Sequence, residues 1–547
     1  MNNKKINFEY LYIIFFISIF LLMGCSNLFA NKLSHDTPYA YLAGDAVHHH
    51  LFAQMTKEQG GYLSRPGYMF LGYNDTIPYN PVIIEHLSAG FSHISGLETY
   101  DSIYLLQFLM GLGAVLIMYF IIRRFNIRVA MLSLPFSLLL FTGKYYTAFT
   151  WGKWELIPAQ LFLIGFFWSL SYFKEKWSPY LTGLFLGASF MCHVIEGIWG
   201  IGFLFIFVGL GLIRERKDYI KENWKKYLII FVVFILMTGY YLPIFKNSHY
   251  SARQGVIFRI STSFDAGSPI PFFKELGIFW IFFIIAIAFF ILSKDKKENI
   301  WFLIPVYMLA ISLTNYIGFD KSLITRLIWP IYLMPLFGFG IYIMLSKVIE
   351  NRNIIFSIST SLLLIGIVFF GMYNVISTPG MVNPYHWEAL NWIKDNTPED
   401  SNVLFFYGDL YGQGKPLYYC ERLSYRIVNQ YIEEEGNYLF AMTKNQTLRY
   451  YNANAVFFKK GEGLYRKGFF SFGHHFIEDN INTTALYNAK MDICDFDYVV
   501  LDRVTSNIKI SQYNMDIANW LVSKEVFVPV FQNNFVIILK YRGECNV

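Results

Sequence analysis

The stretch "SIYLLQFLMGLGAVLIMYFIIRR", residues 102–124, decides the fold of this chain. Residues 102–122 carry no charged side chain, and two adjacent arginines follow them. An uninterrupted apolar stretch of this length crosses the hydrocarbon core of a bilayer as an α-helix. Basic residues just beyond such a helix favour the cytoplasmic side. The stretch therefore predicts a transmembrane helix whose C-terminal end, at Arg123 and Arg124, faces the cytoplasm.

The same pattern recurs through most of the chain. Further apolar segments lie at residues 8–30, 129–147, 156–173, 179–194, 197–213, 227–245, 277–293, 300–317, 326–346 and 354–376. The composition agrees, because 55% of residues are hydrophobic, 15% are charged and the mean hydropathy is +0.36. Soluble domains are less apolar and more charged. We therefore predict an α-helical polytopic membrane protein with about 11 transmembrane helices.

The distribution of lysine and arginine predicts the orientation. One alternating set of short connections holds Lys4, Lys5, Arg123, Arg124, Arg128, Lys174, Lys176, Arg214, Arg216, Lys217, Lys221, Lys225, Lys226, Lys294, Lys296, Lys297, Lys347 and Arg352. By the positive-inside rule this set and the N-terminus are cytoplasmic, and the chain is a multi-pass protein of the plasma membrane. Residues 31–101, 148–155, 246–276 and 318–325 then face outward. The net charge of +6 is a topology signal and gives no reason to expect nucleic acid as a partner.

The cysteines leave two questions open. "LLMGCS" places Cys25 after an apolar run, so the first segment has an alternative interpretation as a lipoprotein signal, although Met23 fits its cleavage pattern poorly. A disulfide is also compatible with an outer location of Cys420, Cys494 and Cys545, but the sequence does not select the pair.

After residue 376 the composition becomes more polar and no segment is long enough to span a membrane. "NPYHWEALNWIKDNTPEDSNVLFFYGD", residues 383–409, predicts a helix, a turn at Pro398 and a strand. Further apolar strands are expected at 496–502 and 534–541. We therefore predict a transmembrane domain at 1–376 and a soluble, extracytoplasmic α/β domain at 377–547.

The first outer loop, 31–101, is too long to be only a connection, so we expect it to be structured. Gly44 and Asp45 precede a helix pattern that contains three consecutive histidines. Asp is a favoured N-cap residue, and an ionised carboxylate at this place is also suited to accept a proton or to hold a cation. Both interpretations of Asp45 stand. His48 and His49 lie close to the face of the predicted helix that carries Asp45. They are either metal ligands or hydrogen-bonded side chains. His50 is the weakest functional candidate of the three histidines.

Other polar residues lie close to predicted spans. Glu155 belongs to the short second outer loop, and His193 and Glu196 lie where the fifth segment ends. Ionisable groups this close to a bilayer tend to line cavities, although a solvated turn or a local pair is the plainer alternative. Arg326 opens the tenth segment on its outer side. Arginine is suited to binding phosphate, and the alternative is that Arg326 extends to the membrane interface. Arg253 is a weaker candidate for the same phosphate role.

Taken together, these elements resemble the GT-C superfamily of polytopic glycosyltransferases, which includes protein mannosyltransferases, aminoarabinose transferases and oligosaccharyltransferases. The matching stretches, in chain order, are "AGDAVHHH" (43–50), "IPYNPVIIEHLSAGFSHISG" (77–96), "WGKWE" (151–155), "CHVIEG" (192–197), "ITRLIWPIYLMPLFGFG" (324–340) and "HWEALNWIKDNTPEDSNVLFFYGD" (386–409). Each stretch is short, and the pattern is specific only as a set.

The resemblance implies transfer of a sugar from a polyprenyl-phosphate donor to a glycan, lipid or protein acceptor, with inversion at the anomeric carbon. Asp45 would be the catalytic acid/base, Arg326 would bind the departing lipid phosphate, and Glu155 would contact metal or acceptor. A divalent cation, Mg²⁺ or Mn²⁺, is the candidate cofactor. No Trp-Trp-Asp element occurs, which argues against sequon glycosylation, and Ala46 replaces the acid that follows Asp in mannosyltransferases.

Two other functions remain as alternatives. One is a transporter or flippase for a lipid-linked glycan, which more often shows inverted repeats and broken spans. The other is a non-catalytic envelope assembly protein, in which Asp45 is only a cap and Arg326 only an anchor. The sugar, the acceptor and the oligomeric state are not encoded in any pattern that we recognise.

Overall fold

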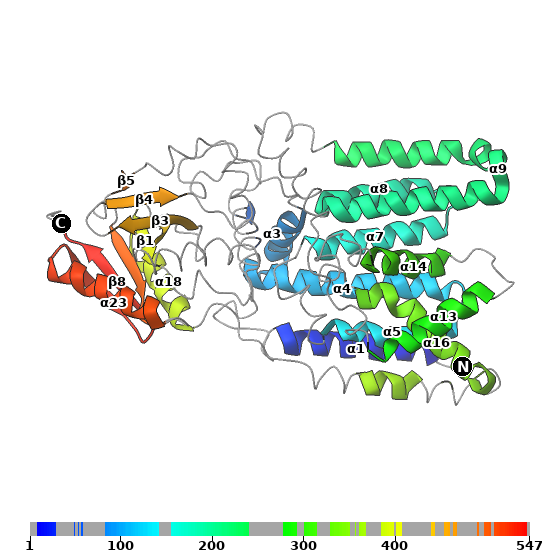
Figure 1. Cartoon of the computed structure of the whole chain (residues 1–547), viewed down its shortest axis with the longest axis horizontal. Helices are drawn as coiled ribbons and strands as arrows, with labels where there is room; N and C mark the ends of the chain where they lie inside the picture. Colours follow the sequence, from blue (N-terminus) through cyan, green and yellow to red (C-terminus); the bar gives the residue numbers. More distant parts are fainter. Residues whose placement is uncertain are drawn as a thin grey trace, which may run out of the picture.

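A bundle of apolar helices and a C-terminal β-sheet make up the computed structural model (Figure 1). The structure describes residues 8–28, 83–141, 155–239, 277–292, 300–313, 329–349, 360–367, 384–398, 401–406, 439–443, 453–459, 463–467, 490–491, 497–504 and 508–543, together with His49, Ala53, Thr56, Lys57 and Phe356. The helices come first in the chain and the sheet comes last, as the change in composition near residue 377 indicates.

Helix α1 (Phe8–Leu28) packs against α4 (Thr99–Arg123), the helix formed by the opening stretch. Phe20 contacts Phe108, and its ring centroid is 4.7 Å from that of Phe141. Phe141 ends the short 3-10 helix η2 (Leu138–Phe141), which follows α5 (Ile127–Ser137). Because these rings are buried, they fix the separation of the three helices through dense apolar packing.

Helices α7 (Leu156–Ser171), α8 (Ser178–Cys192) and α9 (Val194–Thr238) follow one another in space as in sequence. The α9 ribbon runs to one end of the bundle, reverses there and returns (Figure 1). Its two arms correspond to the predicted segments 197–213 and 227–245. Helix α8 packs between them, because a Cβ on Gly197 would meet Phe190 and one on Gly183 would lie 2.7 Å from the Ile230 carbonyl oxygen. Small residues allow this close approach of membrane helices.

Helices α13 (Phe279–Leu292), α14 (Ile300–Leu313) and α16 (Trp329–Ile349) complete the described bundle, and residues 360–367 are also helical. Helix α16 packs on both α5 and α13. Phe136 of α5 stacks on Phe337 of α16 with ring centroids 4.7 Å apart. The late helices are thereby joined to the early ones, rather than forming a separate bundle.

Two stretches of the described chain are long and apolar enough by themselves to cross a membrane: Thr99–Arg123 and Val194–Ile213. Shorter apolar helices lie at 8–24, 127–141, 156–171, 279–292, 301–311 and 330–346. The mostly helical architecture is therefore as predicted. The number of eleven spans stays a prediction.

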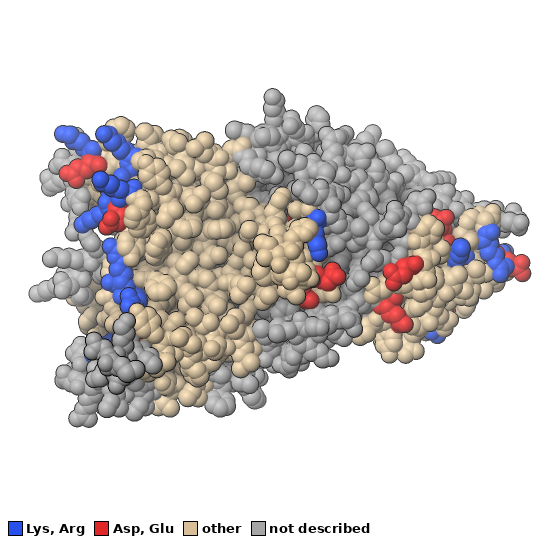
Figure 2. All heavy atoms as spheres, turned by 180° about the vertical axis from the view of Figure 1, so that it is seen from behind, with Lys and Arg blue, Asp and Glu red and all other residues tan. Residues whose placement is uncertain are grey.

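Basic side chains gather at one end of the bundle, at the left of Figure 2, while the side of the bundle is nearly free of charge. Arg124 at the end of α4 donates to the Ser171 carbonyl at the end of α7, and Lys226 of α9 donates to the Phe173 carbonyl at 2.9 Å. These bonds join three helices at the same level. We call this end of the bundle the basic end.

The C-terminal region forms a sheet with strand order β5-β4-β3-β2-β1-β6-β8-β7. The strands are β1 (Asn402–Phe406), β2 (Leu439–Thr443), β3 (Ala453–Lys459), β4 (Gly463–Lys467), β5 (Lys490–Met491), β6 (Tyr498–Asp502), β7 (Phe527–Gln532) and β8 (Val536–Tyr541). Strands β1 and β6 are parallel, and their neighbours are antiparallel to them. Helices α18 (Pro384–Asn396) and α23 (Ile508–Ser523) pack on this sheet, so the region is α/β as predicted.

Candidate functional site

Buried ionisable side chains converge at the end of the bundle opposite the basic end. Helix α3 (Ile83–Ser95) lies at this end, which is nearer the sheet (Figure 1). The helix ends that meet there are those of α3, the N-terminus of α7, and the junction between α8 and α9. His49, from the first outer loop, joins them. We call His49, Glu85 and Glu155 the histidine clamp.

The imidazole of His49 lies between two carboxyl groups. Its Nδ1 is 2.7 Å from Oε1 of Glu85 on α3, and its Nε2 is 2.8 Å from Oε2 of Glu155, which precedes α7. His49 is 1% exposed and the two glutamates are 2% and 5% exposed. Each ring nitrogen of His49 faces a buried carboxyl group. Each nitrogen can donate to a carboxylate only if it carries a proton, and this favours the imidazolium form of His49.

Electrostatics supports the charged form of His49. Burial by itself lowers the pKa of the imidazole, but the charges and hydrogen bonds of Glu155 and Glu85 outweigh burial and raise the pKa to about 10. His49 is therefore a cation near neutral pH. Its positive charge joins residue 49 to α3, where Glu85 lies 36 residues later, and to the start of α7, where Glu155 lies 106 residues later.

A second imidazole–carboxylate pair lies at the junction of α8 and α9. His193 has extended backbone angles (φ −157°, ψ 122°) and separates the two helices by a single residue. Its Nδ1 pairs with Oε2 of Glu196 in the first turn of α9, and both side chains are buried. The bond from Ser189 Oγ to the Ala159 carbonyl, at 2.8 Å, holds the end of α8 against α7.

The two groups of charges share one region of the bundle. Cys192, a free and buried cysteine, lies within electrostatic range of Glu85, Glu155 and Glu196 together. Tyr332 of α16 lies within range of Glu196. Helices α7, α8 and α9 contact one another and α3 contacts α8, so these four helices meet around this buried polar centre.

Helix α3 presents its polar side to this centre. Ile84, Glu85, Ser88, Ala89 and Ser92 are its buried residues. Leu87 and Ile94 are 39% and 88% exposed. A helix that hides its small and polar residues and exposes apolar ones suits the membrane interface, where lipid covers the apolar side.

The structure brings four of the predicted site residues to this end of the bundle: His49, Glu155, His193 and Glu196. Four others, Asp45, His48, Arg253 and Arg326, lie outside the described residues, so their roles stay predictions.

Sequence analysis did not single out Glu85. The signal available was an acidic residue within the apolar pattern "VIIEHLSAGF", residues 82–91, and a carboxylate at that place would ordinarily be assigned to the solvated face.

Among the described residues, no three His, Cys, Asp or Glu side chains are arranged to hold a metal ion. In the histidine clamp both ring nitrogens of His49 are already at hydrogen-bond distance from a carboxyl oxygen. The side chains of the histidine clamp therefore act as buried charges held by one another.

Comparison of sequences finds no relative, because no protein-family model matches the chain and no curated protein is significantly similar to it. Comparison of structures does. ArnT from Cupriavidus metallidurans bound to undecaprenyl phosphate superimposes with a TM-score of 0.59 at 11% identity, over 96% of this chain and 97% of ArnT. The apo state of ArnT gives a TM-score of 0.56 at 11% identity over 97% and 98%.

A second similar structure is the archaeal oligosaccharyltransferase AglB from Archaeoglobus fulgidus, in complex with an inhibitory peptide and a dolichol-phosphate. It has a TM-score of 0.53 at 13% identity, over 89% of this chain and 69% of AglB. This chain has the GT-C fold. GT-C proteins are integral membrane proteins, which agrees with the apolar helices described above. The resemblance expected from the short sequence motifs is thus confirmed at the level of the fold.

Proposed function

We propose that this chain is a membrane glycosyltransferase that moves a sugar from a polyprenyl-phosphate-linked donor to an acceptor at the outer face of the membrane. The observation that carries the proposal is the GT-C fold over nearly the whole chain. ArnT was crystallised with undecaprenyl phosphate and AglB with a dolichol-phosphate. A polyprenyl phosphate is the product that remains when such a donor loses its sugar.

Asp45 is the proposed catalytic base. The acceptor hydroxyl attacks the anomeric carbon, and its proton passes to the Asp45 carboxylate. The bond between that carbon and the phosphate oxygen breaks, and the lipid phosphate leaves with the bonding electrons. A single displacement of this kind inverts the anomeric configuration. General base catalysis typically contributes about 10²–10⁴-fold to the rate.

The histidine clamp supports this assignment by holding the segment that follows Asp45. His49 is four residues after Asp45, and four residues of extended chain reach at most about 14 Å. His49 is itself held by a hydrogen bond to Glu85 at 2.7 Å and by an ion-pair contact with Glu155 at 2.8 Å. We therefore assign His49 and Glu85 as positioning residues. Glu155 is a positioning residue too, and it is also the proposed contact for the acceptor or a metal ion.

Arg326 and Arg253 are the proposed partners of the lipid phosphate. Negative charge builds on this phosphate as the sugar leaves, and a fixed guanidinium stabilises it most where water is excluded. The proposal includes the topology inferred from the sequence, with the basic end in the cytoplasm and the domain 377–547 outside. Mg²⁺ or Mn²⁺ remains a candidate cofactor, with Asp45 among its ligands.

Reconstitution tests the proposal. The purified full-length chain is placed in liposomes with a panel of polyprenyl-phosphate sugars and extracted envelope acceptors, and mass spectrometry follows the glycosylated acceptor and the released lipid phosphate. Asp45→Asn should fold and bind lipid but lose transfer by about 10²–10⁴-fold. Glu98→Gln is the matched control, because Glu98 is an exposed acid of the same outer loop whose side chain makes no cap hydrogen bond.

Full transfer by Asp45→Asn would remove the catalytic assignment. Movement of intact lipid-linked sugar across the liposome membrane, without any transfer, would favour a flippase instead.

A further inference from the structure

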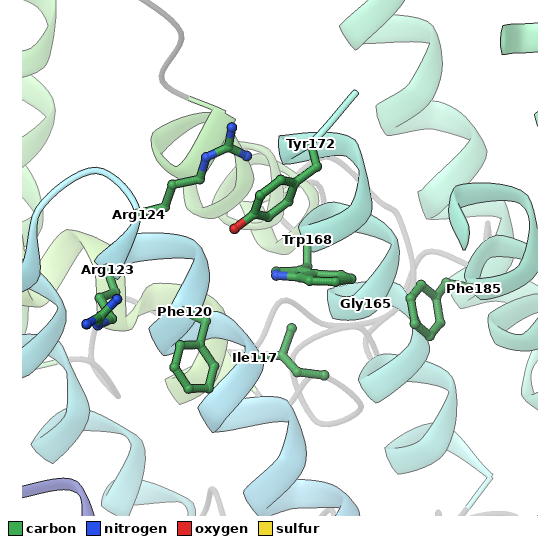
Figure 3. Close-up of a pocket in the computed structure, with 8 residues that line it drawn as sticks. All are labelled: Ile117, Phe120, Arg123, Arg124, Gly165, Trp168, Tyr172 and Phe185. Atoms are coloured by element: carbon green, nitrogen blue, oxygen red, sulfur yellow. The ribbon is translucent and has the colours of Figure 1, made fainter. Parts of the chain in front are cut away.

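A pocket opens at the basic end of the bundle (Figure 3). It lies at the C-terminal end of α7, whereas the histidine clamp lies at the N-terminus of that helix. Its volume is about 560 Å³. Residues of α4, α7 and α8, with the chain just beyond α4 and α7, line it: Ile117, Phe120, Arg123, Arg124, Gly165, Trp168, Tyr172 and Phe185. None of the proposed glycosyltransferase chemistry uses it.

The mouth of the pocket is cationic. The Arg124 guanidinium lies 3.8 Å from the centroid of the Tyr172 ring, and its Nη1 donates to the Ser171 carbonyl. Its Nε and Nη2 make no hydrogen bond within the described part of the chain. Arg123, in contrast, is committed to Glu9 of α1 through Nε and Nη2. Of the two arginines that line the pocket, Arg124 therefore has N–H donors available for a ligand.

Aromatic rings mark the level of the mouth. The ring of Trp168 stacks on that of Trp177 with centroids 5.5 Å apart, and its centroid is 5.4 Å from that of Tyr172. Tryptophan and tyrosine are enriched where membrane helices cross the headgroup layer. Figure 2 shows Lys and Arg gathered at one end of a bundle whose side is nearly free of charge. Because Trp168, Trp177 and Tyr172 lie beside Arg124 at that end, we infer that the pocket mouth lies at a membrane–water interface.

The interior of the pocket is apolar and runs along the helices. Ile117 lies seven residues before Arg124, and Gly165 lies seven residues before Tyr172. Seven residues are about two helical turns, or roughly 10 Å. Helices α4 and α7 both end at the mouth. Ile117 therefore lies on the same face of α4 as Arg124, and Gly165 on the same face of α7 as Tyr172, but both lie deeper in the bilayer. Gly165 has no side chain, and Phe185 closes the space beside it at about 3.1 Å from where a Cβ would stand.

A cationic mouth above an apolar groove at this depth matches an amphiphile. We propose that the pocket binds one anionic glycerophospholipid of the leaflet at the basic end, with its phosphate on Arg124 and an acyl chain between Ile117 and Phe185. None of the lining residues is acidic. The ammonium of a zwitterionic headgroup would therefore gain no partner here, whereas a net negative headgroup gains the guanidinium.

Such a lipid would join α4, α7 and α8 by filling the space between them. This inference does not depend on the proposed transfer reaction, because the pocket and the histidine clamp lie at opposite ends of the same helices (Figure 1).

Native mass spectrometry of the full-length chain, delipidated in detergent, tests the proposal. We would titrate it separately with phosphatidylglycerol, phosphatidylcholine, undecaprenyl phosphate and inorganic phosphate. One phosphatidylglycerol should bind more tightly than phosphatidylcholine, and inorganic phosphate should not displace it. Arg124→Gln removes the headgroup donors and Ile117→Trp fills the groove from α4, so each should weaken this binding by about tenfold.

Lys176→Gln is the matched control, since Lys176 is an exposed cation at the same end that does not line the pocket. Its lipid binding should stay within about twofold of the wild type. Thermal unfolding without lipid checks that Arg124→Gln and Ile117→Trp are folded.

Equal retention of phosphatidylglycerol by wild type, Arg124→Gln and Ile117→Trp would overturn the assignment of this pocket. Undecaprenyl phosphate is also expected at the proposed transfer site, so its binding bears on this pocket only where Arg124→Gln and Ile117→Trp weaken it. Loss of undecaprenyl phosphate rather than phosphatidylglycerol from both variants would overturn the choice of ligand, and displacement by inorganic phosphate would reduce the site to a simple anion site.

Discussion

Both ends of the helical bundle bury glutamate side chains, but different cations neutralise them. At the basic end, Glu9 is 3% exposed and accepts from Arg123 and, at 2.6 Å, from the hydroxyl of Tyr119. At the opposite end, Glu85 and Glu155 share the imidazole of His49. The first arrangement joins α1 to α4, and the second joins an outer loop to α3 and α7.

The difference lies in which cation can lose its charge. A guanidinium stays protonated at any pH at which a protein is folded, so the cation of the Glu9–Arg123 pair does not lose its charge as the pH rises. An imidazole is charged only while its neighbours keep its pKa high. The bundle therefore has a fixed electrostatic contact at one end and an adjustable one at the end where we propose the reaction. Four variants or conditions test this difference between the two ends of the bundle.

Replacement of the clamp cation should have the largest effect. His49→Leu leaves Glu85 and Glu155 buried beside each other without a positive partner, and removing one member of a buried ionic group costs about 3–5 kcal/mol. The unfolding temperature in detergent and the rate of sugar transfer should both fall. His93→Gln, an exposed histidine of α3, should leave both unchanged. If His49→Leu unfolds like the wild type, the clamp contributes nothing to the fold.

Replacement of the fixed cation should cost less. Arg123→Met removes the partner of Glu9, but the Arg123 side chain is 41% exposed and water can replace part of its contact. We expect a loss of about 1–3 kcal/mol in the free energy of unfolding. The double variant Glu9→Leu/Arg123→Met should recover most of it, because the buried carboxylate is then absent. A double variant as unstable as the single one would show that packing, not charge, is responsible.

The pH dependence of stability should separate the two ends. The pKa of His49 is 6.5 when unfolded and about 10 in the clamp. Its contribution is therefore complete below about pH 6.5 and is lost as the pH rises through about 10. The unfolding temperature of the wild type should fall over this upper range. His49→Gln should lack this fall, while Arg123→Met should retain it.

Neutralising one clamp carboxylate should move that transition only modestly. Glu155→Gln or Glu85→Gln removes one of the charges that raise the pKa of His49. The midpoint of the high-pH loss should shift downward by about one pH unit, equivalent to about 1.4 kcal/mol. The shift should be larger for Glu155→Gln, because Glu155 is the stronger of the two influences. An upward shift in either variant would contradict the electrostatic account of the clamp.

The sequence predicted elements better than it predicted contacts. Residues 102–123 lie in α4 as expected, since the twenty-one uncharged residues 102–122 have few alternatives to a membrane helix. The predicted helix near Pro384 and the strands at 402–407, 496–502 and 534–541 correspond to α18, β1, β6 and β8. In the site, the sequence drew attention to His49 and Glu155 but gave no means of pairing them, because they are 106 residues apart.

Local pattern thus determined what each segment prefers: hydrocarbon for the apolar helices, an interface for α3 and a sheet for the C-terminal strands. These preferences depend on neighbours in sequence, which the chain displays directly. Tertiary structure decided that His49 meets Glu85 and Glu155, that α3 hides its acidic side, and that Arg124 is left with free donors beside an apolar groove. Those outcomes depend on which helix ends arrive at the same depth, and that is set by packing among helices far apart in the chain.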